Sequence, residues 1–197
     1  MSRLFQRYSS PAAFLDHQLH AIQVAFLAGE VFRQWPDLRQ ITERFCWMVG
    51  DRVRLPVVRG TGGPAAAECL VDAFSWLDTA PERWTLTATA AKSVFVAGLL
   101  YNAPYITHLN VQVDGQPWAL ADGEPMCALL ARGCHVDCDV RSDRGRADTD
   151  GMAANRVLLL SRMYPDGGHM SLDLDLAFAV FPPHALMVDL FGSDEVE

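Results

Sequence analysis

The chain has 197 residues, of which half are hydrophobic and a fifth are charged, a balance that excludes a disordered protein and predicts one domain with a continuous core. Its formal net charge of −8 is uneven: residues 1–100 hold ten Lys+Arg and nine Asp+Glu (+1), whereas residues 101–197 hold six and fifteen (−9). Nucleic acids are bound through clustered Lys and Arg, so we expect no nucleic-acid partner. The acidic second half favours a basic partner, a cation or simply solubility.

The sequence also bears on the cellular compartment. No apolar run is long enough to cross a bilayer, and the N-terminal residues lack the apolar core of a signal peptide, so we expect a cytoplasmic protein with no membrane partner. The five cysteines are an odd number and form no C-x-x-C pair. We therefore expect free thiols in a reducing compartment rather than disulfides. They are Cys46, Cys69, Cys127, Cys134 and Cys138.

The first element in the chain is predicted to be a long helix. Ser10 followed by Pro11 is typical of a helix start, and the helix should end near Trp35, which precedes a proline. We expect Gly29 to weaken or bend it. Its apolar stripe is Leu15, Leu19, Ile22 and Phe26.

Further helices are expected before residue 101. One runs from Asp37 to a terminating Gly50, and another follows the glycine-rich loop 60–64. Thr79-Ala-Pro-Glu82 matches a capping box, which predicts a helix from there to about Leu100. The threonines at 85, 87 and 89 alternate along residues 83–90, so a strand there stays open.

From residue 105 the hydrophobic period changes to two, which predicts strands. Residues 105–113 and 116–121 flank Asp114-Gly115, a favoured two-residue hairpin turn. A short helix at 125–132, a strand at 134–140 and a second hairpin of 155–164 with 169–181 should follow. We predict a single α+β domain, in which three or four N-terminal helices (about 1–101) pack on one face of a mostly antiparallel sheet (about 102–197).

Two of these expected strands share an unusual pattern. His135-Val-Asp-Cys-Asp139 and His169-Met-Ser-Leu-Asp-Leu-Asp175 place one His and two Asp at alternate positions, with other residues between them. In an extended strand these polar residues lie on one face. The simplest interpretation is the solvent face of a half-buried sheet. The same face also suits a partner or, with imidazole and carboxylate together, a divalent metal.

Two functions follow from this face. The first is a non-catalytic acidic interaction module, an accessory subunit, adaptor, immunity-like inhibitor or peptide-binding partner of a separate enzyme, which needs no cofactor. Its partner would be a basic protein or extended peptide, and its candidate contact residues are Asp137, Asp139, Asp173, Asp175 and the edge-strand Trp118. The alternative is a small metal-dependent enzyme, whose candidate divalent-metal ligands are His135, Asp137, His169 and Asp173.

Overall fold

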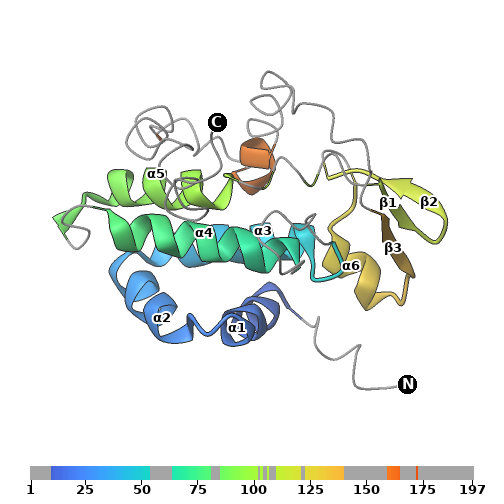
Figure 1. Ribbon diagram of the computed structural model, residues 1–197, viewed down its shortest axis with the longest axis horizontal. Helices are drawn as coiled ribbons and strands as arrows, with labels where there is room; N and C mark the ends of the chain where they lie inside the picture. The colour runs from blue at the N-terminus through green and yellow to red at the C-terminus, as the bar shows by residue number, and fades with distance from the viewer. Residues whose placement is uncertain are drawn as a thin grey trace, which may run out of the picture.

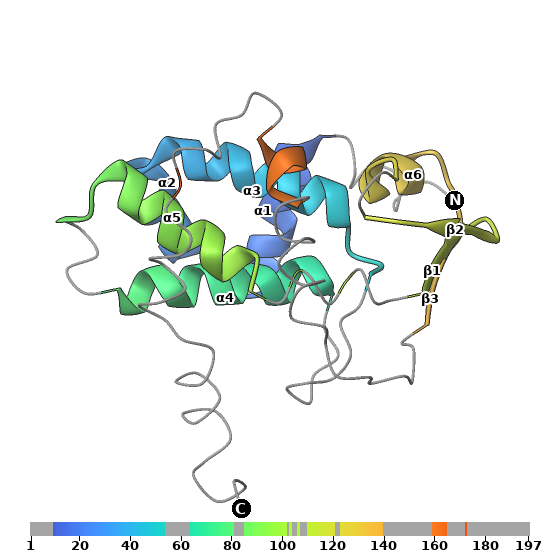
Figure 2. The ribbon, with the colours of Figure 1, turned by 90° about the horizontal axis from the view of Figure 1, so that it is seen from above.

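The computed structural model describes residues 10–53, 64–80, 85–101, 103, 106, 110–120, 123–139, 159–164 and 172. These residues form a mixed α+β fold of six α-helices, a further helical segment at 159–163, and a three-stranded antiparallel sheet. The predicted α+β class is confirmed. The helices form the larger body, and the sheet lies at one end of it beside α6 (Figures 1 and 2). The helices are α1 (Pro11–Ala21), α2 (Ala25–Gln34), α3 (Pro36–Val49), α4 (Ala65–Thr79), α5 (Ala88–Leu99) and α6 (Met126–Ala131).

The expected single helix at residues 10–35 is wrong, because the chain breaks between α1 and α2. Ser10 caps α1 by accepting a hydrogen bond from the Ala13 N–H at 3.2 Å. The break is a Schellman motif: Gln23 has a φ of +60°, and the N–H of Val24 donates to the carbonyl of Leu19 at 3.2 Å. Gly29, the expected weak point, lies inside α2. The backbone hydrogen bonds of this motif offset the cost of a positive φ at a residue other than glycine. The hydrophobic periodicity of the sequence does not reveal such a break.

α3 ends as the sequence predicts, at a glycine that also brings α6 close. Gly50 has a φ of +71°, which favours glycine, and its position would place a Cβ only 2.7 Å from the Cγ of Met126. α6 therefore packs against the carboxyl end of α3. The thiol of Cys127 donates a long hydrogen bond of 3.8 Å to the carbonyl of Cys46 across this contact.

The helix α5 exists as predicted, but its expected capping box is wrong. Thr79 is the last residue of α4, and its hydroxyl donates to the carbonyl of Ser75 at 2.9 Å. The residue that caps α5 is Thr87, whose side chain accepts from the Ala90 N–H at 3.2 Å. Residues 88–90 are helical and 85–87 form no strand, so the strand alternative is wrong over the described part of 83–90.

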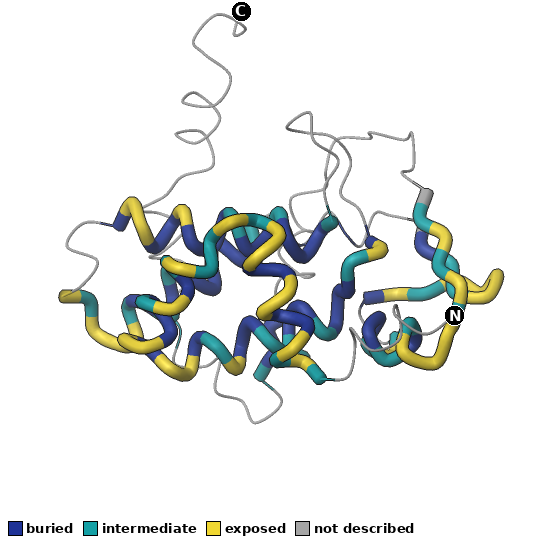
Figure 3. The backbone as a smooth tube through the Cα atoms, turned by 90° about the horizontal axis from the view of Figure 1, so that it is seen from below, coloured by how far each residue is buried: buried dark blue, intermediate teal, exposed yellow. Residues whose placement is uncertain are grey.

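The core lies between the helices and consists largely of aromatic and aliphatic side chains. Phe74 of α4 contacts Phe95 of α5 edge to face, with ring centroids 5.2 Å apart, and also contacts Phe32 of α2 at 5.9 Å. Buried positions recur along each helix and give way to exposed ones at the hairpin tip (Figure 3). Among the described residues, no helix combines the length and the hydropathy that crossing a membrane requires.

The sheet contains the strands β1 (Asn110–Val113), β2 (Gln116–Trp118) and β3 (Val136–Asp139), in the order β2-β1-β3. Asp114 and Gly115 join β1 to β2 with φ values of +50° and +75°, as a type I′ turn requires. The first hairpin is therefore confirmed over 110–118 and the strand at 134–140 over 136–139. The expected strand bounds are wrong at residues 106, 119–120 and 134–135, which are described but lie outside the strands. The expected strand at 155–164 is wrong over 159–163, which is helical; its apolar residues at 159, 160 and 163 are buried at helical spacing. The expected strand at 169–181 lies outside the described residues apart from Leu172.

Candidate functional site

The two faces of the sheet differ sharply in chemistry. The register pairs Val111 with both Trp118 and Cys138, so these three side chains share one face, which packs against the helical core. Gln112 pairs with both Pro117 and Asp137 on the opposite face. We call Gln112, Pro117, Asp137 and the alternate position His135 the polar face. The sequence pattern of 135–139 therefore produces the two-sided strand that it predicts.

His135 and Asp137 form the exposed centre of the polar face. The Nε2 of His135 lies 3.1 Å from an Oδ1 of Asp137, and their side chains are 77% and 62% exposed. A polar contact this exposed contributes little to stability. The carboxylate of Asp137 is thus open to solvent and to a partner.

A third acid, Asp114, stands at the tip of the hairpin and fixes the start of β3. Its carboxylate accepts the backbone N–H of His135 at 2.7 Å. This hydrogen bond stabilises the charged form and is the main reason that the pKa of Asp114 is lowered. Asp114 therefore adds a fixed negative charge beside the polar face.

The remaining predicted acids are only partly placed. Asp139 lies in β3 opposite Asn110, which puts it at the same alternate position as Asp137. The structure does not describe its side chain. The other three predicted residues also lie outside the described part of the chain: His169, Asp173 and Asp175. The convergence of the two His/Asp segments stays a prediction.

Trp118, the predicted aromatic contact residue, lies on the other face. Its indole N–H donates to the carbonyl of Glu124 at 2.9 Å, and its ring packs against the core while remaining partly exposed. A Cβ at Gly123 would lie 2.6 Å from the indole nitrogen, so a glycine there allows the backbone at 123 to lie close to the ring. Trp118 and Asp137 therefore project from opposite faces, and its visible role is to hold the sheet against the helices.

Two of the four predicted metal ligands lie side by side in the described part of the chain. They are the imidazole of His135 and the carboxylate of Asp137. In this part of the protein no group of three or more His, Cys, Asp or Glu side chains is arranged to hold a metal ion. The other two proposed ligands, His169 and Asp173, lie beyond it.

Two arginines outside the predicted site residues link the helical segment 159–163 to the loop after β2 and to α3. Arg162, in the helical segment 159–163, donates to the carbonyls of Leu120 and, at 2.7 Å, Gly123 in the loop after β2. Arg44 of α3 donates to the carbonyl of Met163 at 3.0 Å. Their acceptors are main-chain oxygens far away in the sequence, so no residue pattern signals these contacts.

Phe26 lies in a different environment from the one that the sequence predicts. It was expected in the buried stripe of the first helix, but its side chain is 82% exposed on α2. The Schellman break changes the direction of the chain after Gln23, so the helical spacing that joins Phe26 to Ile22 no longer applies. This exposed aromatic lies in α2, whereas the polar face belongs to the sheet.

The cysteines give no sign of an activated nucleophile. All five are free, as predicted, and Cys46, Cys69 and Cys127 are buried. Burial raises the pKa of each of these three thiols. A thiol that resists deprotonation is a poor nucleophile, so these residues serve the core.

Comparison with known proteins identifies no relative: no family model, no curated protein and no solved structure matches the chain.

Proposed function

We propose that this chain is a non-catalytic interaction module that binds a basic protein segment on the polar face of its sheet. The observation that carries the proposal is the exposed carboxylate of Asp137 on a strand whose other face is anchored in the core. Such a strand presents charge from a rigid support. An accessory subunit or adaptor that works beside a separate enzyme fits this arrangement.

Charge around the sheet supports a basic partner. Residues 110–139 contain five acids and a single basic residue, Arg132, a balance of −4. Arg132 forms a two-bond ion pair with Glu124, one of its bonds being 2.7 Å long. Its charge is therefore largely matched by its own neighbour, and Asp114 and Asp137 keep the surroundings negative. Complementary charge of this kind steers association and makes it sensitive to salt.

The proposal can be tested with defined peptides. A fluorescent 12-residue peptide rich in Arg and Lys and a matched peptide rich in Asp and Glu are titrated with the protein, and anisotropy is recorded at low and high salt. We expect only the basic peptide to bind, more weakly at high salt. Asp137→Asn should weaken its binding two- to five-fold, that is by about 0.5–1 kcal/mol.

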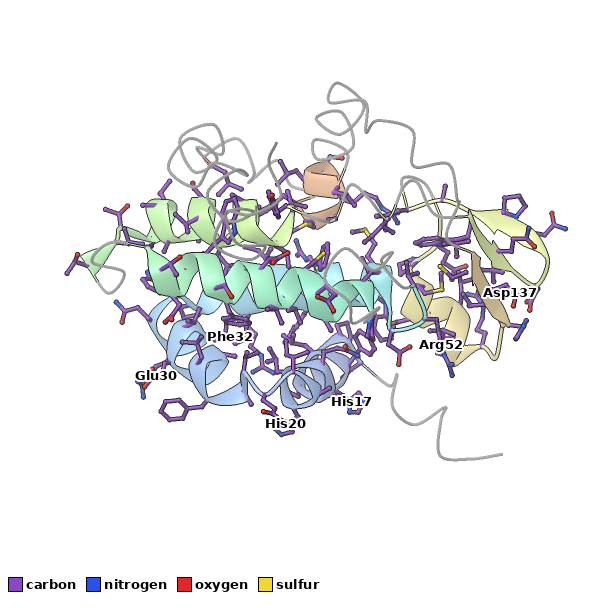
Figure 4. The ribbon with its side chains drawn as sticks, in the orientation of Figure 1. His17, His20, Glu30, Phe32, Arg52 and Asp137 are labelled. Carbon is purple, nitrogen blue, oxygen red and sulfur yellow. The ribbon has the colours of Figure 1, made fainter. Side chains whose placement is uncertain are left out.

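Glu30→Gln is the matched control, because it removes the same charge from α2 at the opposite end of the molecule (Figure 4). Equal losses in the two variants would mean that only net charge matters. In that case, or if the basic peptide does not bind, the polar face is not the binding site.

A metal-dependent enzyme is the second candidate, and it draws on one observation, the 3.1 Å separation of the His135 imidazole and the Asp137 carboxylate. Metal analysis of protein purified without chelators, followed by thermal melts with Mn²⁺, Zn²⁺, Fe²⁺ and Ca²⁺, tests it. A stoichiometric metal, or a rise in Tm that His135→Ala abolishes, would favour this candidate over the interaction module.

A further inference from the structure

The two outer edges of the described sheet differ in their capacity to accept another strand. The two-residue turn makes Val113 and Gln116 a hydrogen-bonded pair, so the next pair, Gln112 and Pro117, is non-hydrogen-bonded. The backbone of Pro117 consequently faces away from β1, toward the outer edge of β2. Proline has no N–H to donate there. The edge of β2 is thus closed to a continuous new ladder.

The outer edge of β3 has the opposite character. The Asp114 N–H donates to the carbonyl of His135 at 2.9 Å, so by alternation the backbone of Asp137 also faces β1. The N–H and C=O groups of Val136 and Cys138 then face outward. Within the described part of the chain, β3 pairs with β1 alone, and neither residue has a backbone partner on the outer side. These two residues offer two donors and two acceptors in strand geometry.

The side chains beside this edge indicate which residue pattern in a partner strand would fit it. Val136 and Cys138 turn their half-buried side chains toward the core, while Asp137 stands exposed between them. In an antiparallel addition the partner residue opposite Asp137 belongs to a non-hydrogen-bonded pair, in which the two Cα atoms lie only about 4.5 Å apart. A basic side chain at that position lies beside the carboxylate, and its neighbours on the partner strand lie beside Val136 and Cys138.

We infer that the partner of the proposed function, on which this inference depends, binds as an antiparallel strand added to the outer edge of β3. The partner is an extended segment in which basic residues alternate with aliphatic ones. The basic residues face Asp137 and the alternate position 139, and the aliphatic residues continue the apolar face. Main-chain hydrogen bonds to Val136 and Cys138 supply affinity, and the acids select the basic side chains.

N-methylated peptides test the strand addition directly. The probe is an end-capped heptapeptide that alternates Arg and Val, and its binding to the whole 197-residue chain is measured by anisotropy. In the proposed register the Val amides donate to β3 and the Arg amides point away from it. N-methylation of two central Val residues should weaken binding about ten-fold or more, since each removes a hydrogen bond and adds a clash. The matched peptide, methylated at two Arg residues, should bind within about two-fold of the parent.

Hydrogen exchange supplies an independent readout on the protein. The amides of Val136 and Cys138 should become protected when the parent peptide binds, whereas the Asp137 amide, which faces β1, should change little. Equal binding of the two methylated peptides, with no new protection, would overturn strand addition but leave an acidic binding face standing. No binding of the parent peptide would overturn both proposals.

Discussion

Two helical glycines face very different surroundings, so the same substitution should change stability in opposite directions. A Cβ at Gly98 of α5 would lie 2.8 Å from the Cα of Ala73 and 3.0 Å from the carbonyl oxygen of Asp72, both in the backbone of α4. These atoms can yield only if the helices separate. A Cβ at Gly29 of α2 would meet nothing within 4 Å.

The magnitudes follow from these contacts. Alanine favours a helix over glycine by about 1 kcal/mol, and overpacking a core costs about 1–3 kcal/mol. Because the clash at Gly98 is with backbone, we take the upper part of that range and expect Gly98→Ala to destabilise the fold by about 1–2 kcal/mol. Gly29→Ala should stabilise it by up to about 1 kcal/mol.

Urea denaturation followed by far-ultraviolet circular dichroism measures both variants against the parent protein. Thermal melts should move apart as well, by about 2–4 °C for each kcal/mol in a chain of this size. If the Gly98→Ala variant is as stable as the Gly29→Ala variant, then α4 and α5 do not approach each other as closely as the structure shows. The packing argument would then fail.

Three more outcomes are expected. Phe26→Ser should change the free energy of unfolding by less than about 0.5 kcal/mol, whereas Phe95→Ser should abolish cooperative unfolding; a large loss at Phe26 would mean that this side chain is covered. Because the pKa of Asp114 is lowered, its charge favours folding at neutral pH and this contribution disappears as the pH falls below about 4, so Asp114→Asn should flatten the fall of Tm in acid. Burial raises the pKa of the Cys46 and Cys127 thiols, so mass spectrometry should find both unalkylated in native protein at pH 8 and modified in urea.

The sequence predicted those elements whose ends are determined locally. The type I′ turn at Asp114-Gly115 and the glycine that terminates α3 depend on backbone angles that few residue types adopt, and both occur where expected. The strand around Asp137 also follows from its own alternation. In each case neighbouring residues carry the information.

The predictions that fail are those for segments whose structure is determined by contacts between residues distant in the sequence. Apolar residues that fit a strand at 155–164 also fit one helical turn at 159–163, and burial of Leu159, Leu160 and Met163 selects the helix. The capping box at Thr79 fails because α4 extends through that residue. At the candidate site the sequence predicts that Asp137 is exposed, but it does not reveal that Trp118 lies on the opposite face, because that depends on strand register.

Register also decides the meaning of Pro117. From the sequence, a proline in a short strand indicates only that the strand lies at an edge. The pairing of Pro117 with Gln112 adds that its nitrogen faces outward, so this edge lacks a donor where a new strand would need one. Had the hairpin turn been one residue longer, the same proline would have faced β1 and interrupted the existing ladder instead. Within the described sheet, the turn thus leaves the outer edge of β2 without a donor at Pro117, whereas the N–H groups of Val136 and Cys138 face the outer edge of β3. The two strands are separated by a helix in the chain.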